Sequence, residues 1–146
     1  MAKLEDIECE IKFPSAEALD AIAVTAATDT TEKTITVSLP TGASIVRAML
    51  AAFITAMNNS ANAQKIDVDV KGRVSAGSWN TYFSQDDSIG FPAADGATTG
   101  FVPLQDVSAL VTGGGTYGFK CTITQSSANS VRYTTQYLLI VTYKMS

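Results

Sequence analysis

The sequence predicts an all-β protein: an antiparallel β-sandwich, jelly-roll-like, with an N-terminal arm. Apolar and polar residues alternate with a period of two, the spacing of a strand with one buried face, over residues 34–39, 65–74, 117–124 and 131–143. Short polar or glycine-containing connections follow these stretches, which is typical of sandwiches and jelly rolls. The 146 residues suffice for one hydrophobic core. We therefore expect a single sandwich domain over residues 34–146, preceded by an acidic arm and linker over residues 1–33.

The arm contains an alternating stretch of its own. Apolar and charged residues alternate between residues 7 and 13, so a strand here has one apolar and one acidic face. We predict that this strand extends from the domain and adds to a neighbouring subunit or another protein, because backbone pairing along a sheet edge supplies affinity. The alternative is an ordinary first strand of the domain's own sheet. The predicted partner-binding residues are Ile7, Glu8, Cys9, Glu10, Ile11 and Phe13.

Turn signals divide the next part of the chain. Pro14 ends the first strand, and residues 15–23 begin with a serine and contain helix formers, which favours a short helix or turn. A polar loop is predicted over residues 25–33, followed by a strand over residues 34–39. That strand stops at Pro40-Thr41-Gly42, where proline presets one dihedral angle and glycine is free to adopt the next.

Residues 44–57 fit either a helix or a strand. Ile45, Met49, Phe53 and Met57 recur at helical spacing, and the alanine content also favours a helix. A strand buried on both faces, however, reads as a continuous apolar run, and the segments on both sides are predicted strands. We therefore predict a strand here.

The middle of the chain is predicted to be one regular strand followed by irregular structure. Residues 65–74 alternate charged residues with apolar residues or glycine, so we expect a half-buried strand. Residues 77–83 indicate a turn and a short aromatic strand. Residues 84–100 are rich in Gly, Pro, Asp and Ala and are predicted to be a long loop. Residues 101–111 indicate a strand broken by Pro103, which cannot donate to a central ladder.

The C-terminal third predicts a long hairpin. Two alternating stretches are joined by a short polar connection, Gln125–Ser130. The second stretch is expected to be a central strand of the sandwich. The residues predicted to share the buried faces are Tyr117, Phe119, Cys121 and Ile123, and Val131, Tyr133, Thr135, Tyr137, Leu139, Val141 and Tyr143.

The chain carries no recognisable set of residues for catalysis or metal binding. It contains no histidine, so no imidazole serves as a ligand, general base or proton shuttle. Cys9 and Cys121 each lie in an alternating pattern, which favours buried thiols over a disulfide or a metal site. Asp86, Asp87 and Asp95 are predicted to be solvated rather than calcium ligands. We expect no enzymatic activity, no cofactor and no metal.

The aromatic residues Trp79, Tyr82 and Phe83 are the one group that suits sugar binding, because aromatic rings can form a stacking platform for a saccharide. The alternative, that they are core or interface anchors, is the commoner use of such residues and is the one we predict.

Charge predicts which partners the chain avoids. Residues 1–33 carry eight acidic and three basic side chains, a net charge of −5, whereas the remainder carries six acidic and seven basic, a net charge of +1. An acidic arm repels nucleic acid and attracts a basic partner. Only 16% of the residues are charged and 46% are hydrophobic, so we expect some surface to be covered in a homo-oligomer. The longest charge-free apolar run, Ala48–Ile54, is too short to span a membrane, and we expect neither a membrane partner nor a secretory signal.

Three stretches resemble the small β-sandwich proteins encoded among the virion genes of tailed bacteriophages, in particular head decoration proteins. They are TVSLPTGA at residues 36–43, QKID at 64–67, and SVRYTTQYLLIVTY at 130–143. The resemblance covers residues 34–146 in style rather than through a specific motif. It implies a jelly-roll-like domain, an N-terminal arm, a trimer, and attachment to the major capsid protein at the virion surface without enzymatic activity, after synthesis in the host cytoplasm.

Two other functions fit the same residues. A carbohydrate-binding β-sandwich module would use Trp79 and the loop that follows it. A self-assembling shell or tube subunit would use the same low surface charge. The absence of a basic arm from the sequence disfavours a shell protein that lines nucleic acid.

Overall fold

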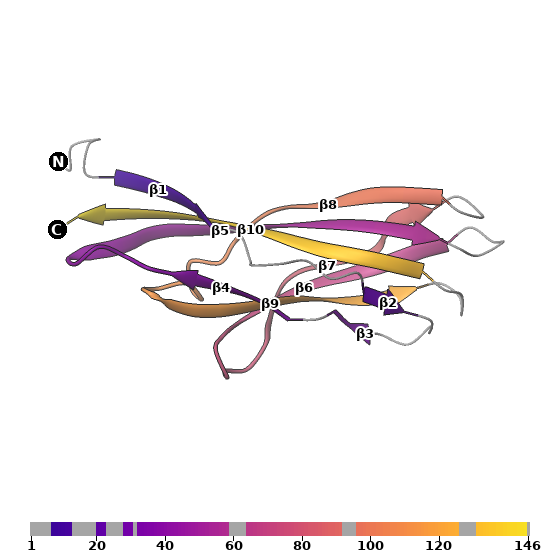
Figure 1. Ribbon diagram of the computed structural model, residues 1–146, viewed down its shortest axis with the longest axis horizontal. Helices are drawn as coiled ribbons and strands as arrows, with labels where there is room; N and C mark the ends of the chain where they lie inside the picture. Colours follow the sequence, from indigo (N-terminus) through magenta and orange to yellow (C-terminus); the bar gives the residue numbers. More distant parts are fainter. Residues whose placement is uncertain are drawn as a thin grey trace.

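Ten strands make up the regular structure of the residues that the computed structural model describes (Figure 1). The structure describes residues 7–12, 20–22, 28–30, 32–58, 64–91, 96–125 and 131–145, and the side chains within residues 29–30, 32–54, 65–86, 102–124 and 135–145. No helix occurs in these ranges, and so none that is long and apolar enough to cross a membrane. The strands are β1 (Ile7–Lys12), β2 (Asp20–Ile22), β3 (Thr28–Asp29), β4 (Lys33–Val37), β5 (Ala43–Asn58), β6 (Gln64–Val74), β7 (Asn80–Phe91), β8 (Gly96–Asp106), β9 (Gly115–Gln125) and β10 (Val131–Met145).

The strands form two antiparallel sheets. Sheet A has the order β1-β10-β5-β8, and β2 also pairs with β10. Sheet B has the order β3-β9-β6-β7, and β4 also pairs with β9. β1 and β2 pair with successive parts of β10, so they act as one interrupted edge strand, and β3 and β4 do the same along β9.

Counted in this way, eight strands give the topology of a jelly roll. Taken in chain order, the first, third, sixth and eighth lie in sheet A, and the second, fourth, fifth and seventh lie in sheet B. Two sheets that share the chain in this alternating manner, with the first strand beside the last, are a jelly roll. The predicted all-β sandwich is therefore confirmed.

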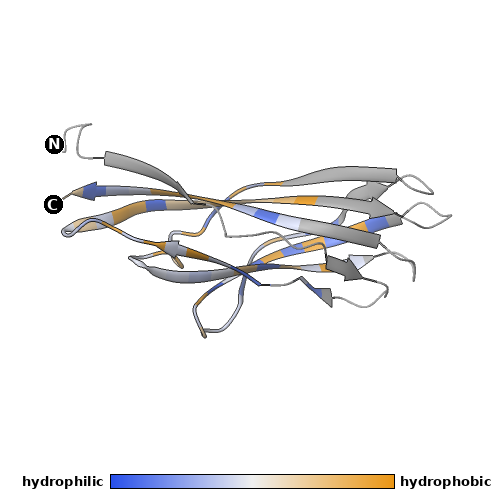
Figure 2. Ribbon diagram, viewed as in Figure 1, coloured by the Kyte–Doolittle hydropathy of each residue, from blue (hydrophilic) through white to orange (hydrophobic). Residues whose placement is uncertain are grey.

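The core lies between the two sheets and uses the faces that alternation predicts. On β6, the side chains of Ile66, Val68 and Val70 are each 0% exposed. In sheet A, Leu139 pairs with Leu50 and Val141 pairs with Ala48, and all four side chains are buried. In both sheets, hydrophobic residues occur along the described parts of the strands, with hydrophilic residues between them (Figure 2). The other predicted core residues whose side chains are described are also buried: Tyr117, Phe119, Cys121, Ile123, Thr135, Tyr137 and Tyr143. The side chains of Val131 and Tyr133, predicted on the same face, lie outside the described ranges.

The ambiguous segment 44–57 is a strand, as predicted. β5 is the longest strand, with 16 residues, and lies between β10 and β8. The turn before it is also confirmed: Ala43 donates its amide to the carbonyl of Pro40 at 3.0 Å, and Gly42 has a φ of 85°. Pro40 is the first residue of this turn, so its ring does not set a central dihedral of the turn.

The predicted hairpin of the C-terminal third is wrong. β9 belongs to sheet B and β10 to sheet A, so the polar connection carries the chain from one layer to the other. The prediction that β10 is a central strand is confirmed, because β10 lies between β1 and β5. Sequence alternation identifies each strand but not the strand with which it pairs.

The predicted long loop over residues 84–100 is also wrong. β7 continues to Phe91 and β8 begins at Gly96, paired with β6 and β5 respectively. Both are edge strands, where glycine and proline are tolerated because one side of the backbone makes no ladder bonds. Pro103 lies in β8 next to a register shift, as expected for a broken strand, and a turn follows in which Leu110 donates to the carbonyl of Val107 at 2.9 Å.

The segments before β4 differ in part from the prediction. Residues 20–22 of the predicted helix form the strand β2, and the rest of that prediction lies outside the described residues. The predicted polar loop over residues 25–33 contains β3, and its last residue begins β4. Tertiary pairing with β9 and β10 overrides the weak local helix signal.

Candidate functional site: the outer faces of the two sheets

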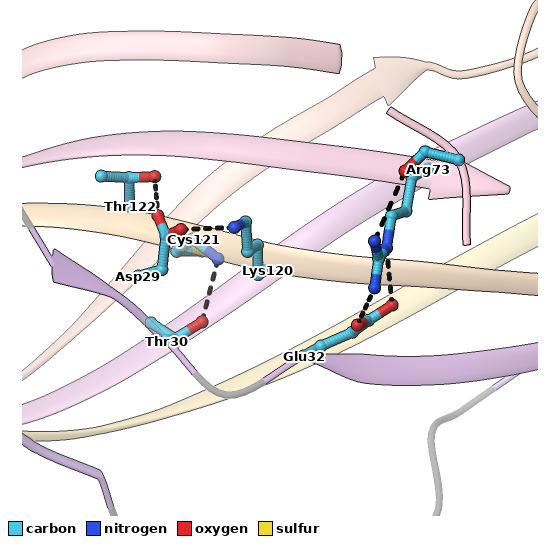
Figure 3. A network of polar contacts seen from close by, with 8 residues as sticks. Asp29, Thr30, Glu32, Arg73, Lys120, Cys121 and Thr122 are labelled. Carbon is cyan, nitrogen blue, oxygen red and sulfur yellow. Dashed lines mark hydrogen bonds and ion pairs between the residues drawn. The ribbon is translucent and has the colours of Figure 1, made fainter. Parts of the chain in front are cut away.

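The outer face of sheet B carries a polar network that we call the clip. Arg73 on β6 pairs with Gly118 on β9, and Lys71 pairs with Lys120, so these residues share a face of the sheet. Asp29 and Glu32, from the segment that joins β3 to β4, provide the opposite charges. The clip consists of Asp29, Thr30, Glu32, Arg73, Lys120 and Thr122 (Figure 3).

Glu32 reaches Arg73 by crossing β9 above a glycine. Arg73 donates from Nε to Glu32 Oε1 at 3.1 Å and from Nη2 to Oε2 at 2.6 Å, which is a bidentate pair. The hydrogen bond to Glu32 raises the pKa of the Arg73 guanidinium. A Cβ atom at Gly118 would lie 1.8 Å from Glu32 Oε1. The missing side chain of Gly118 is thus what leaves room for this ion pair.

The segment around Thr30 is attached to β9 by both backbone and side-chain bonds. Thr30 donates its amide to the carbonyl of Cys121 at 2.8 Å, and the Cys121 amide donates to Thr30 Oγ1 at 3.0 Å. Asp29 accepts hydrogen bonds from Lys120 and, at 2.5 Å, from the hydroxyl of Thr122. Burial alone raises the pKa of Asp29, but these bonds outweigh it, so the pKa lies below its usual value. The clip therefore fastens Asp29 and Thr30 to β9, and Glu32 to β6.

Trp79 lies against the cations of the clip. Its ring centroid is 4.5 Å from Arg73 Cζ and 4.3 Å from Lys120 Nζ, within the range of cation–π attraction. Tyr82 and Phe83 are half-buried and pack against the core, and burial raises the pKa of the Tyr82 hydroxyl. Arg73 and Lys120 thus take up part of the ring surface on which a sugar could stack. Tyr82 and Phe83 pack as core anchors, as predicted, and for Trp79 the anchoring role stays a prediction.

The outer face of sheet A is apolar where that of sheet B is charged. Between the buried residues of β10 and β5 lie outward positions that pair directly: Leu138 with Ala51 and Ile140 with Met49. Gln136 pairs in the same way with Phe53. We call this group the apolar face: Met49, Ala51, Phe53, Leu138 and Ile140.

The members of the apolar face cover one another only in part. Met49, Phe53, Leu138 and Ile140 are half-buried, whereas the small side chain of Ala51, at the centre of the group, is 1% exposed. At its margin Arg47 Nε lies 3.6 Å from Asp106 Oδ2, an exposed ion pair between β5 and β8. Three of the four large hydrophobic side chains that are exposed among the described residues, Val46, Leu104 and Met145, also belong to strands of sheet A.

The predicted partner-binding strand is found in the chain's own sheet. Ile7–Lys12 forms β1, the edge strand beside β10, which corresponds to the alternative of an ordinary first strand. Ile7, Cys9 and Ile11 are the register partners of Lys144, Thr142 and Ile140. Glu8 and Glu10 are the register partners of Tyr143 and Val141, and Phe13 lies outside the described residues. A role of these six residues in binding a partner stays a prediction, as does the boundary of the arm at residue 33.

The one cysteine whose side chain is described lies in the core. Cys121 is 0% exposed and forms no disulfide, which confirms the predicted buried thiol. The hydroxyl of Tyr137 donates to Cys121 Sγ at 3.3 Å, a contact between the two sheets. Burial raises the pKa of the Cys121 thiol to about 12, so the thiol is protonated at neutral pH. This cysteine is a packing residue.

The aspartates considered for calcium are only partly described. Asp86 is exposed on β7, and the side chains of Asp87 and Asp95 lie outside the described ranges. Within those ranges no group of three or more His, Cys, Asp or Glu side chains is arranged to hold a metal ion.

No protein-family model and no curated protein match the sequence. Solved structures with a similar chain fold include the infectious bursal disease virus VP2 subviral particle, with 7% identity, a TM-score of 0.44, and coverage of 97% of this chain and 38% of that chain. Eiger TNF from S. frugiperda has 9% identity, a TM-score of 0.47, and coverage of 97% and 94%. The CBM36-1 domain of a multidomain xylanase from the hindgut metagenome of Trinervitermes trinervoides has 10% identity, a TM-score of 0.39, and coverage of 91% and 96%. This chain spans 38% of the length of the viral chain, and these comparisons assign no function to it.

Proposed function

We propose that the protein is a non-enzymatic structural subunit of a virus particle, a decoration protein that binds the capsid surface as an oligomer. The observation that carries the proposal is the contrast between the two outer faces. The charged groups of the clip bind one another, whereas the apolar face of sheet A presents side chains that water solvates poorly.

The composition of the chain supports an assembled state. Only 16% of the residues are charged, against about 25% in a typical soluble domain, so little charge is available to keep a lone subunit dispersed. The sequence contains no histidine, which removes the commonest general base and metal ligand. The resemblance of residues 34–146 to head decoration proteins supplies the capsid as the partner, and a trimer as the assembly.

The proposal is tested with DNA-free shells of the major capsid protein from the genome that encodes this chain. Purified protein is mixed with the shells and sedimented, and we expect saturable co-sedimentation with a fixed number of copies per shell. Dissociated capsid subunits serve as the control, because a decoration protein recognises the assembled lattice. Absence of binding to intact shells contradicts the proposal.

A glycan-binding measurement on the same protein separates the main alternative. A decoration protein leaves the glycans unbound. Specific binding to a saccharide that is lost on Trp79→Ala would replace the proposal by a carbohydrate-binding module, because the variant removes the aromatic ring on which a sugar stacks.

A further inference from the structure

We propose that the apolar face of sheet A is the surface on which a second copy of this chain packs, sheet against sheet. This inference rests on the oligomeric part of the proposed function and assigns it to named residues. They are Met49, Ala51 and Phe53 of β5 and Leu138 and Ile140 of β10.

The pattern of the sheet itself points to a covered face. An antiparallel sheet of a sandwich normally has one face on the core and one solvated face with polar residues. Sheet B follows this rule, since the residues that alternate with its buried positions on β6 include Asp69, Lys71 and Arg73. Three consecutive outward positions of β5 are apolar, and so are two of β10, Leu138 and Ile140, which lie between Gln136 and Thr142. The centre of this outer face is thus composed like a buried face.

The charges of sheet A favour an identical copy over a charged partner. On β5 and β8 the charged side chains at the margin of the apolar face are Arg47 and Asp106, which are already paired with each other. The five residues of the apolar face carry no charge, so they meet a copy of themselves without like-charge repulsion, and the exposed Lys144 lies four residues beyond Ile140 at the end of β10. Across a two-fold axis, Arg47 of one copy can also face Asp106 of the other, and the reverse, because the two residues have opposite charges. A strongly basic or acidic partner would find no complementary charge on the apolar face.

The dimensions of the sheet suit a stable interface. The 15 residues of β10 extend for ~50 Å at ~3.3 Å per residue. Four strands spaced by ~4.8 Å give a width of ~19 Å. Because β1, β2 and β8 are shorter than β10, the face of sheet A measures roughly 800 Å², which matches the ~800 Å² per partner that a standard protein interface buries. A second copy laid over the sheet, with the apolar face at its centre, buries a surface of the required size.

The test compares outward substitutions on the two sheets in the full-length protein. Leu138→Lys and Ile140→Lys place a charge on the apolar face without entering the core, and Thr36→Lys places the same charge at an exposed position of β4 in sheet B. Sedimentation velocity is measured for each over a range of concentrations. We expect an oligomer for the parent protein and for Thr36→Lys, and a concentration for half-dissociation raised at least tenfold for the two variants of the apolar face.

Folding and salt dependence complete the test. Circular dichroism and thermal melting show whether each variant is folded, and Met49→Gln is a milder second variant if a lysine prevents folding. Association through the apolar face should persist at high salt, whereas association through ion pairs weakens as salt screens the charges. If the parent is an oligomer and the folded variants remain equally associated, the inference is wrong although the oligomer stands. A parent that is monomeric at all concentrations but binds capsid shells also overturns it and leaves the decoration role in place. An oligomer that ignores the shells contradicts the decoration role alone.

Discussion

At the scale of single residues, Gly118 has an effect that its own conformation does not reveal. Glycine within a strand normally costs stability, and replacement by alanine gains about 0.5–1 kcal/mol. At Gly118 the three atoms nearest to a new Cβ all belong to Glu32, with Oε1 at 1.8 Å. Gly118 therefore lowers the intrinsic stability of β9 but leaves the space in which Glu32 and Arg73 form their ion pair.

We therefore predict that the effect of Gly118→Ala on the free energy of unfolding depends on the residue at position 32. Gly118→Ala should give no gain, or a loss, of unfolding free energy in the parent protein, because the Glu32 carboxylate must leave Arg73. In a Glu32→Ala background the same substitution should gain about 0.5–1 kcal/mol. Chemical denaturation of the four proteins measures both steps. Gly115→Ala, also on β9, is the control, because its new Cβ meets only ordinary contacts at 3.9 Å or more. An equal effect of Gly118→Ala in both backgrounds would contradict this role of Gly118.

A second prediction at this scale concerns the core position Leu139. Its side chain is 0% exposed between the sheets, so Leu139→Asp places a carboxylate where no opposite charge is available in the hydrophobic core around it. We expect a loss of unfolding free energy on the order of 4 kcal/mol or failure to fold. Thr36→Asp introduces the same carboxylate at an exposed position of β4 in sheet B and should change stability little. A melting temperature of Leu139→Asp near that of the parent would contradict the placement.

At the scale of elements, β1 is an edge strand whose removal tests the arm. β1 pairs with β10 over six residues of each strand, from Ile7 with Lys144 to Lys12 with Leu139. Deletion of residues 1–13 should therefore expose the backbone of a central strand, and we expect earlier melting or aggregation. Thermal melting and light scattering measure this outcome. A deletion that folds with the stability of the parent, but no longer binds the capsid or assembles, would instead support an arm that serves a partner.

The acidic residues of β1 allow a milder variant. Glu8→Gln with Glu10→Gln keeps the backbone pairing of β1 and removes two negative charges. Thermal stability should stay close to that of the parent. If this strand contacts a basic partner, the variant should bind capsid shells more weakly than the parent at low salt. The difference should shrink at high salt, because salt screens the same attraction in the parent.

The elements also show what the sequence can predict. Alternation identifies β4, β6, β9 and β10, because one face of each is buried. The continuous apolar run of β5 was correctly assigned to a strand from its neighbours, since periodicity alone was ambiguous. The strands β7 and β8 are not predicted over residues 84–100, because their composition is that of a loop and only pairing with β6 and β5 makes them regular. The local sequence pattern identifies a strand, whereas the strand with which it pairs depends on the whole fold.

The two outer faces differ in how much of them the sequence could reveal. The apolar face follows from the same run that made β5 ambiguous, because outward apolar residues conceal the alternation. The clip was not predicted, since Glu32, Arg73 and Lys120 are far apart in the sequence and nothing local marks them as partners. Gly118 was the one available signal, because a glycine inside a strand often marks a close approach of another group.

At the scale of the whole molecule, the jelly-roll order makes nearly every sheet contact non-local. β1 must find β10, and β5 must find both β8 and β10, before either sheet is complete. Loop closure of this kind is entropically costly, and domains of this topology fold on timescales of about milliseconds to seconds. The apolar face is exposed throughout that time, so an early association of copies would protect it. The clip, in contrast, joins segments within sheet B and needs no second copy.

The pairing of Ile7 with Lys144 places the beginning of β1 and the end of β10 side by side at one end of the sandwich (Figure 1). Paired antiparallel residues have Cα atoms only about 5 Å apart, so a short peptide can join these two points. The chain could then be opened elsewhere, for example at the Thr41–Gly42 turn, and every strand would keep its neighbours. Such a circular permutant should melt close to the parent, because the spatial arrangement of the strands, and not the position of the chain ends, holds the sheets together. Because Ala43 pairs with Met145, the new chain ends at this turn would lie at the same end of the sandwich as the joined ones, and fusion partners attached to them would project from that end.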